Sequence, residues 1–217
     1  WPTHDIDHPS FYWEARVLRR FKRVGATAVR GAPLRASRQL RESLFYPRAG
    51  WSADPYETID QLMTLSEASG FKSTFFYIPE KTDSVFDPGM PINHPQIRDQ
   101  WHRIHERGHE IGMHPGYDSF DQPEQLSRSA HAIQNQLQEL GINQPRLCSR
   151  QHYLRWKTPE TATALDQANV DEDCTLGFAD QPGFRCGVCY DFPMYDLHQR
   201  TRLRIRQRPL IAMDSTI

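Results

Sequence analysis

The residues best suited to chemistry are two acids near the start of the chain and a histidine far along it. Asp5 and Asp7 are separated by one residue, and His114 ends the apolar stretch from Glu110 to Met113. If Thr3 to Asp7 end a strand, both acids face the same way, because side chains alternate along a strand. One acid could then bind a metal while the other takes a proton. The alternative is a turn that exposes both acids to solvent. The strands and helices that position these residues decide between a metal site and such a turn.

Helices and strands alternate along the chain from residue 54 onward. Periodic apolar residues and capping signals predict helices over 54–70, 95–107, 121–141 and 158–168. Short apolar runs predict strands over 71–79, 110–113 and 145–149, and a strand or loop over 170–178. We expect the first helix to begin at Asp54 as N-cap, with Pro55 at its first position.

This alternation predicts a parallel sheet with crossover helices, in which chemistry gathers at the carboxyl ends of the strands. Four groups fall at those predicted ends, namely Asp5 with Asp7, His114, Arg150-Gln151-His152-Tyr153, and Asp171-Glu172-Asp173. Their convergence predicts a single site at one edge of an α/β fold.

Composition narrows the class of protein. The 217 residues suffice for one domain with a substantial core, and 26 Lys+Arg against 27 Asp+Glu give no argument for nucleic acid. No apolar run approaches the roughly 20 residues of a membrane span, and no signal peptide is visible. The four cysteines do not form a disulfide framework, so reduced thiols and a cytoplasmic rather than exported protein are expected. Because the chain lacks an initiator Met, we expect truncation at both ends.

Residues 10–48 form a basic insertion that carries many arginines and only two glutamates. Phe11, Val17, Leu18 and Phe21 predict a short amphipathic helix within it. The insertion is interpreted as a solvated surface segment. The alternative is a surface for anionic glycans, phospholipid headgroups or a nucleotide-linked sugar.

The order and spacing of the motifs resemble the polysaccharide deacetylases of carbohydrate esterase family 4, the NodB-homology domain. The resemblance rests on Thr3-His4-Asp5-Ile6-Asp7, Gly108-His109-Glu110-Ile111-Gly112-Met113-His114-Pro115 and Arg150-Gln151-His152-Tyr153, and it covers essentially the whole chain. It implies one catalytic domain over residues 1–217 with a distorted or incomplete (β/α) barrel. It also implies removal of acetyl groups from N-acetylated saccharides with a divalent metal, usually zinc.

The resemblance further implies that Asp5 is the base and that Asp7 and His114 bind the metal. The family's second metal histidine lies four residues after the first, where this chain has Asp118. The usual proline of the third motif is His152, so either Asp118 or His152 could be the third ligand. With Asp118 the site would have two carboxylates and one imidazole, a harder set of ligands. Manganese, cobalt or iron would then compete with zinc. Three protein ligands leave one position for water, whose pKa zinc lowers toward about 7.

The resemblance assigns roles to three further residues. Arg150 would steady the base carboxylate, and the Tyr153 backbone N–H would face the developing oxyanion. Asp173 falls where an acid would orient the catalytic histidine. The general acid is either His152 or a histidine beyond residue 217.

Two other functions remain open. The missing histidine at position 118 also fits a carbohydrate-binding domain of the same fold whose catalytic set has degenerated. A related metal hydrolase acting on another amide or on an ester is the third possibility, because a fold does not determine a reaction.

Overall fold

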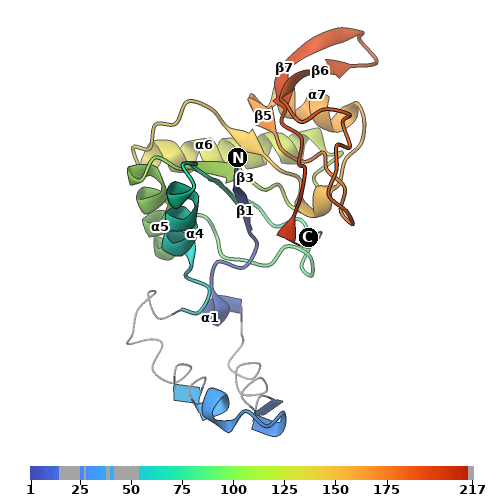
Figure 1. Cartoon of the computed structure of the whole chain (residues 1–217). Coiled ribbons are helices and arrows are strands. Elements are labelled where there is room, and N and C mark those ends of the chain that lie inside the picture. The colour runs from blue at the N-terminus through green and yellow to red at the C-terminus, as the bar shows by residue number, and fades with distance from the viewer. Residues whose placement is uncertain (15–24, 27, 38–39, 42–53, 215–217) are drawn as a thin grey trace.

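The computed structural model describes residues 1–14, 25–26, 28–37, 40–41 and 54–214, which form an α/β fold around one sheet (Figure 1). The strands are β1 (Thr3–Ile6), β2 (Thr74–Tyr77), β3 (Glu110–Met113), β4 (Cys148–Ser149), β5 (Glu172–Asp173), β6 (Phe192–Asp196) and β7 (Thr201–Gln207). The helices are α1 (Phe11–Glu14), α4 (Ile59–Ala68), α5 (Pro95–Glu106), α6 (Pro123–Glu139) and α7 (Glu160–Gln167), with a 3-10 turn at His152–Leu154.

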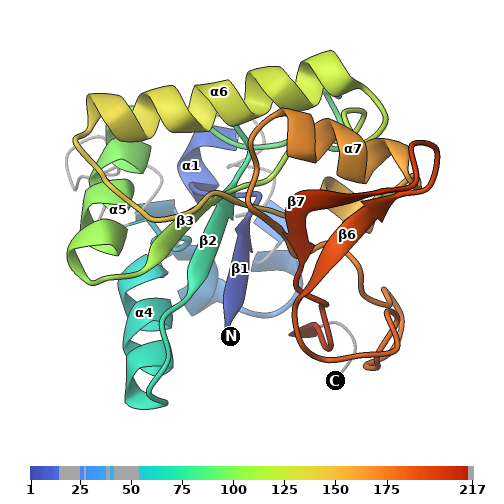
Figure 2. The same ribbon diagram turned by 90° about the horizontal axis from the view of Figure 1, so that it is seen from above.

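The sheet has seven strands in the described residues, in the order β1-β2-β3-β4-β5-β7-β6. All neighbouring pairs are parallel except β6 and β7, which form an antiparallel hairpin. Helices α4, α5, α6 and α7 follow one another around one side of the sheet, as Figure 2 shows. Because β1 to β5 run in the same direction, the loops that follow them meet at one end of the sheet, as predicted.

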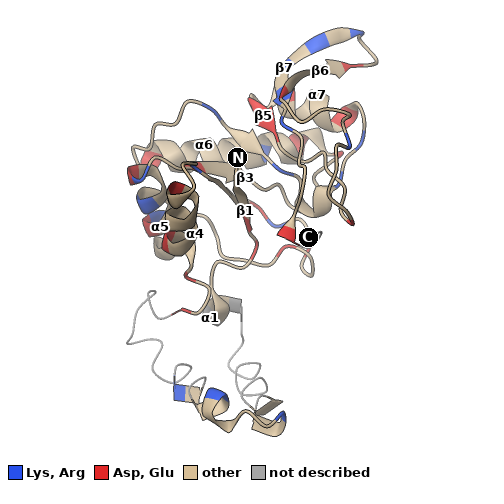
Figure 3. Ribbon diagram, viewed as in Figure 1, with Lys and Arg blue, Asp and Glu red and all other residues tan. Residues whose placement is uncertain are grey.

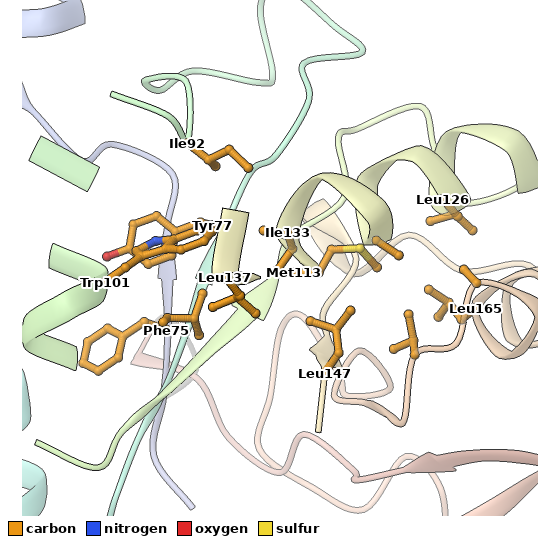
Figure 4. Close-up of a cluster of buried hydrophobic side chains, with 14 of the residues drawn as sticks. Phe75, Tyr77, Ile92, Trp101, Met113, Leu126, Ile133, Leu137, Leu147 and Leu165 are labelled. Atoms are coloured by element: carbon orange, nitrogen blue, oxygen red, sulfur yellow. The ribbon is translucent and has the colours of Figure 1, made fainter. Parts of the chain in front are cut away.

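The core lies between the sheet and these helices. Trp101 on α5 is fully buried and packs edge-on against Tyr77 of β2, with 5.6 Å between ring centroids (Figure 4). Ile133 of α6 and Leu165 of α7 extend the same cluster and are also fully buried. These residues hold the helices against the strands whose ends carry the candidate site.

Charged residues on the helical side neutralise one another. Figure 3 shows acidic and basic residues interspersed along α4 and α5. Arg103 pairs with Glu57, Asp60 and Asp99, and Arg107 pairs with Asp60 and with Glu67. None of the helices in the described part of the chain combines the length and apolarity that a membrane crossing requires.

Most predicted elements occur close to their expected bounds, but the start of the first long helix is wrong. The helix begins at Ile59 rather than after Asp54. Asp54 is buried, and its carboxylate accepts hydrogen bonds from Ser10 Oγ and from the backbone N–H groups of Phe11 and Tyr56. Its oxygens are therefore used to join the start of α1 to this loop instead of capping a helix.

About half of the predicted basic insertion at 10–48 lies outside the described residues. Its amphipathic helix is described only as α1, and residues 15–24 lie outside the described part of the chain.

Gly112 in β3 lets Phe76 of the neighbouring strand lie flat across it. A Cβ at position 112 would lie 2.5 Å from Phe76 Cε1 and 3.0 Å from Thr74 Cγ2. We expect Gly112→Ala to lower the free energy of unfolding by about 1–3 kcal/mol, because the fully buried Phe76 ring has no room to move. Urea denaturation measures this loss. Gly25→Ala is the control, since no atom lies within 4 Å of its added Cβ, and an equal loss in both variants would contradict the prediction.

Candidate metal centre

Asp7, His114 and His152 converge at the carboxyl ends of β1, β3 and β4. Each offers one ligand atom, and these atoms all lie within 4.8 Å of one another. His114 Nε2 is 3.3 Å and His152 Nε2 is 3.6 Å from Asp7 Oδ1, which is buried and has no hydrogen-bond partner among the described residues. A buried carboxylate oxygen without a donor is costly unless a cation contacts it, so the donor set fits a metal ion.

The charge balance of the cluster favours a cation. Burial acts to raise the pKa of Asp7, but the two imidazoles hold it well below its usual range. Burial acts to lower the pKa of His152, yet Asp7 and Asp87 raise it to about 9. The negative surroundings that favour a proton on His152 also favour a divalent metal in its place.

His114 is held in the tautomer that a metal ligand needs. Its Nδ1 donates a hydrogen bond to the backbone carbonyl of Arg150, with 2.5 Å between the two atoms. The Nε2 lone pair is therefore free to face Asp7, and the ring is almost completely buried.

His152 is oriented by Asp87, a residue that the sequence analysis missed. His152 Nδ1 lies 2.9 Å from Asp87 Oδ1, and both side chains are buried. The segment Asp87-Pro88-Gly89 has the composition of a turn, so nothing in its sequence indicates a partner 65 residues away. Such a carboxylate fixes the ring of a metal-binding histidine and raises its basicity.

Asp87 is itself fixed by four donors in addition to His152. Thr82 N, Thr82 Oγ1 and Asp83 N donate to its Oδ2, and Tyr117 N donates to its Oδ1. A Cβ on Gly116 would lie 2.8 Å from Asp87 Oδ2, so this close approach requires glycine. Asp87 therefore joins the loop after β2 to the loop after β3 behind the metal ligands.

We expect Asp87→Asn to weaken metal affinity by about 10- to 100-fold. The asparagine must point its NH₂ group either at His152 and Tyr117 N or at the three donors on the other oxygen, so His152 loses its fixed tautomer. Competition with a chromophoric chelator measures the affinity.

Asp83→Asn is the matched control for this experiment. Asp83 lies in the same loop and accepts hydrogen bonds from Val85 N and Phe86 N, without contacting His152 among the described contacts. An equal loss of affinity in both variants would mean that the loop, rather than the bond to His152, controls metal binding.

Arg150 connects the metal ligands to the second acid. Its Nη1 donates to Asp5 Oδ1 at 2.9 Å, its Nη2 donates to Thr3 Oγ1, and its Nε donates to the carbonyl of Cys174. The same residue receives the hydrogen bond of His114 through its carbonyl. The expected pairing of Arg150 with Asp5 is thus present, and the buried guanidinium holds that carboxylate in place beside the metal ligands.

Both acids of the opening segment line one large cavity along β1. Its volume is about 1400 Å³, and Asp5, Asp7 and Arg150 contribute to its wall. Residues 189–191 and 208–214 also line it. The site is therefore accessible to a ligand much larger than water.

Asp118, the alternative third ligand, lies outside the cluster. Its carboxylate is half exposed and pairs with Arg155 Nη1 at 3.0 Å. Its backbone N–H donates to Thr82 Oγ1. Of the two alternatives for the third ligand, the geometry favours His152.

Asp173 does not contact a histidine among the described residues. Its carboxylate accepts hydrogen bonds from Thr175 N and Thr175 Oγ1, and Thr175 Oγ1 accepts the backbone N–H of Gln151. The predicted role of orienting a catalytic histidine is therefore absent from the described contacts. Asp173 instead supports the chain immediately before His152.

Asp173 should make stability depend on pH. Complete burial raises the pKa of its carboxyl from 3.8 to about 6, so the folded state retains this proton where the unfolded chain has lost it. The resulting penalty is absent below about pH 4 and fully present above about pH 6. We expect Asp173→Asn to gain stability relative to the parent protein across that interval, measured by urea denaturation at each pH. Parallel pH profiles for the two proteins would contradict this.

The remaining candidates are structural. His109 accepts a hydrogen bond from Ser73 N and contacts Glu67, as expected for a packed rather than ligating histidine. All four cysteines are free thiols, with Cys148 and Cys174 buried against Phe76. No protein-family model, curated protein or solved structure matches the chain.

Proposed function

We propose that the chain is a metal-dependent hydrolase that removes acetyl groups from N-acetylated sugars. The observation that carries this proposal is the convergence of Asp7, His114 and His152 beside the Arg150–Asp5 pair, with Asp5, Asp7 and Arg150 lining one open cavity. The resemblance to the NodB-homology domain supplies the substrate class. The sequential strand order from β1 to β5 is compatible with the incomplete (β/α) barrel that this resemblance implies.

Different residues of the chain would bind the metal, accept the proton and stabilise the oxyanion. A divalent metal, with zinc favoured by two imidazoles and one carboxylate, would supply a Lewis acid and acidify bound water. Asp5 would accept the proton of the attacking water, and Arg150 would orient the Asp5 carboxylate through its hydrogen bond. The Tyr153 backbone N–H would donate to the oxyanion of the tetrahedral intermediate, as the resemblance suggests.

Acetate release from N-acetylated saccharides tests the proposal. We expect release by the purified protein, loss of release after chelation, and recovery when zinc, manganese, cobalt or iron is added. Metal binding without release from any saccharide would instead support a carbohydrate-binding domain. Release from simple esters or other amides alone would indicate a related hydrolase. The missing histidine at position 118 no longer favours a degenerate site, because His152 completes a set of three ligand atoms.

A further inference from the structure

A layered stack of side chains lies beside the metal centre. The rings of Phe86 and Tyr117 stack with 4.3 Å between centroids and 24° between planes. The Arg155 guanidinium lies 4.0 Å from the Tyr117 centroid and 4.1 Å from that of Phe120. Since Phe86 covers one face of Tyr117, Arg155 must cover the other. The layers therefore follow the order Phe120, Arg155, Tyr117, Phe86, and the stack ends at Phe86.

Backbone hydrogen bonds fix this stack relative to the metal ligands. Arg155 Nη1 donates to the carbonyl of Tyr117, and Tyr117 N donates to Asp87, the residue that orients His152. Phe86 N donates to Asp83 in the same loop. The aromatic rings are thus preorganised at little further entropic cost to a ligand.

The Tyr153 ring makes edge-to-face contacts with Phe86 and Tyr117 and also contacts the metal ligand His152. Its ring centroid is 5.5 Å from Phe86, 5.4 Å from Tyr117 and 4.7 Å from His152. Tyr153 and Leu154 both have left-handed backbone conformations, with φ of 56° and 52°. Two consecutive strained residues are characteristic of functional sites, and here they present the Tyr153 ring beside a metal ligand.

Two of these rings are exposed to solvent beside the metal ligands. Tyr153 is 61% exposed and Phe86 is 38% exposed. Asp7 lines the cavity along β1, whereas none of the stacked rings belongs to its wall. One metal ligand, Asp7, therefore borders the open cavity, and another, His152, contacts the exposed ring of Tyr153.

We propose that Phe86 and Tyr153 form a subsite for a pyranose ring next to the sugar whose acetyl group is removed. The C–H face of a pyranose is apolar, and an aromatic face removes it from water at low entropic cost. This subsite rests on the proposed function and deepens it, because it assigns residues that contact the sugar next to the reacting one.

Binding of a defined oligosaccharide tests the subsite without turnover. The probe is the β-1,4-linked tetramer of N-acetylglucosamine, titrated into metal-free protein by calorimetry and NMR. We expect Phe86→Ala to weaken binding by about 10-fold and Phe86→Trp to retain it. Upfield ring-current shifts of sugar C–H resonances should occur with the parent protein and disappear with Phe86→Ala.

Tyr195→Ala is the matched control, because Tyr195 is 49% exposed on β6 and lies outside the stack. Its affinity for the tetramer should equal that of the parent protein. Equal affinity of Phe86→Ala and the parent, or no binding at millimolar tetramer, overturns the subsite even if acetate is released. Phe86-dependent binding without acetate release supports the subsite and rejects the hydrolase.

Discussion

His152→Ala is expected to empty the metal site, and Asp118→Ala is expected to leave it filled. His152 Nε2 lies 3.6 Å from the orphaned Asp7 Oδ1, whereas the Asp118 carboxylate pairs with Arg155. Loss of a residue that supports a ligand weakens metal binding by about 10- to 100-fold, so loss of the ligand itself should cost more than about 100-fold. Elemental analysis after dialysis against buffered metal gives the stoichiometry.

The paired variants separate this loss from general unfolding. Both positions follow the same end of the sheet, and circular dichroism should give similar spectra for the two proteins. Asp7→Ala should behave like His152→Ala, because it removes the oxygen at the centre of the cluster. A site that stays filled in His152→Ala and empties in Asp118→Ala would reverse the assignment of the third ligand.

Much of this arrangement could be predicted because strand direction alone determines where loops meet. Asp7, His114 and Arg150 each follow a predicted strand, and parallel strands place their carboxyl ends together. Strand β3 has the predicted bounds from Glu110 to Met113. The same kind of alternation is present in β7, where the buried residues Leu203 and Ile205 alternate with arginines.

The features that the sequence does not predict are contacts between loops that are distant in the sequence and close in space. Asp87 reaches His152 only because Gly116 admits the loop after β2, and no spacing in the sequence records that contact. Tyr153 adopts a left-handed conformation that its residue type disfavours. Asp54 carries a strong capping signal, yet its carboxylate joins α1 to the following loop. Local propensity gives way to tertiary contacts in each case.

Arg150 connects the metal ligands to the proposed base, because it contacts both His114 and Asp5. Its side chain holds Asp5 while its carbonyl fixes the His114 tautomer, so movement of this residue affects both functions. Phe76 supports the guanidinium, which lies 4.8 Å from the ring centroid. Gly112, which lets that ring lie flat, thus contributes to the site from the neighbouring strand.

Asp5→Asn is expected to lower kcat/KM for acetate release by about 10²- to 10⁴-fold while leaving metal stoichiometry unchanged. The asparagine oxygen can still accept the hydrogen bond from Arg150 Nη1, so the local geometry is kept. The amide cannot accept the proton of the attacking water, which is the role proposed for Asp5. Steady-state kinetics and elemental analysis on the same preparation measure both quantities.

Asp191→Asn is the control that isolates this role. Asp191 lines the same cavity, but its carboxylate pairs with Arg206 at 2.6 Å, so its removal should leave the rate within a few-fold of the parent value. A similar loss in both variants would reflect the charge of the cavity rather than a base. Activity retained in Asp5→Asn would remove the base from the mechanism, and a parallel loss of metal would make Asp5 part of the binding site instead. Only a large loss of rate at constant metal content assigns proton transfer to Asp5.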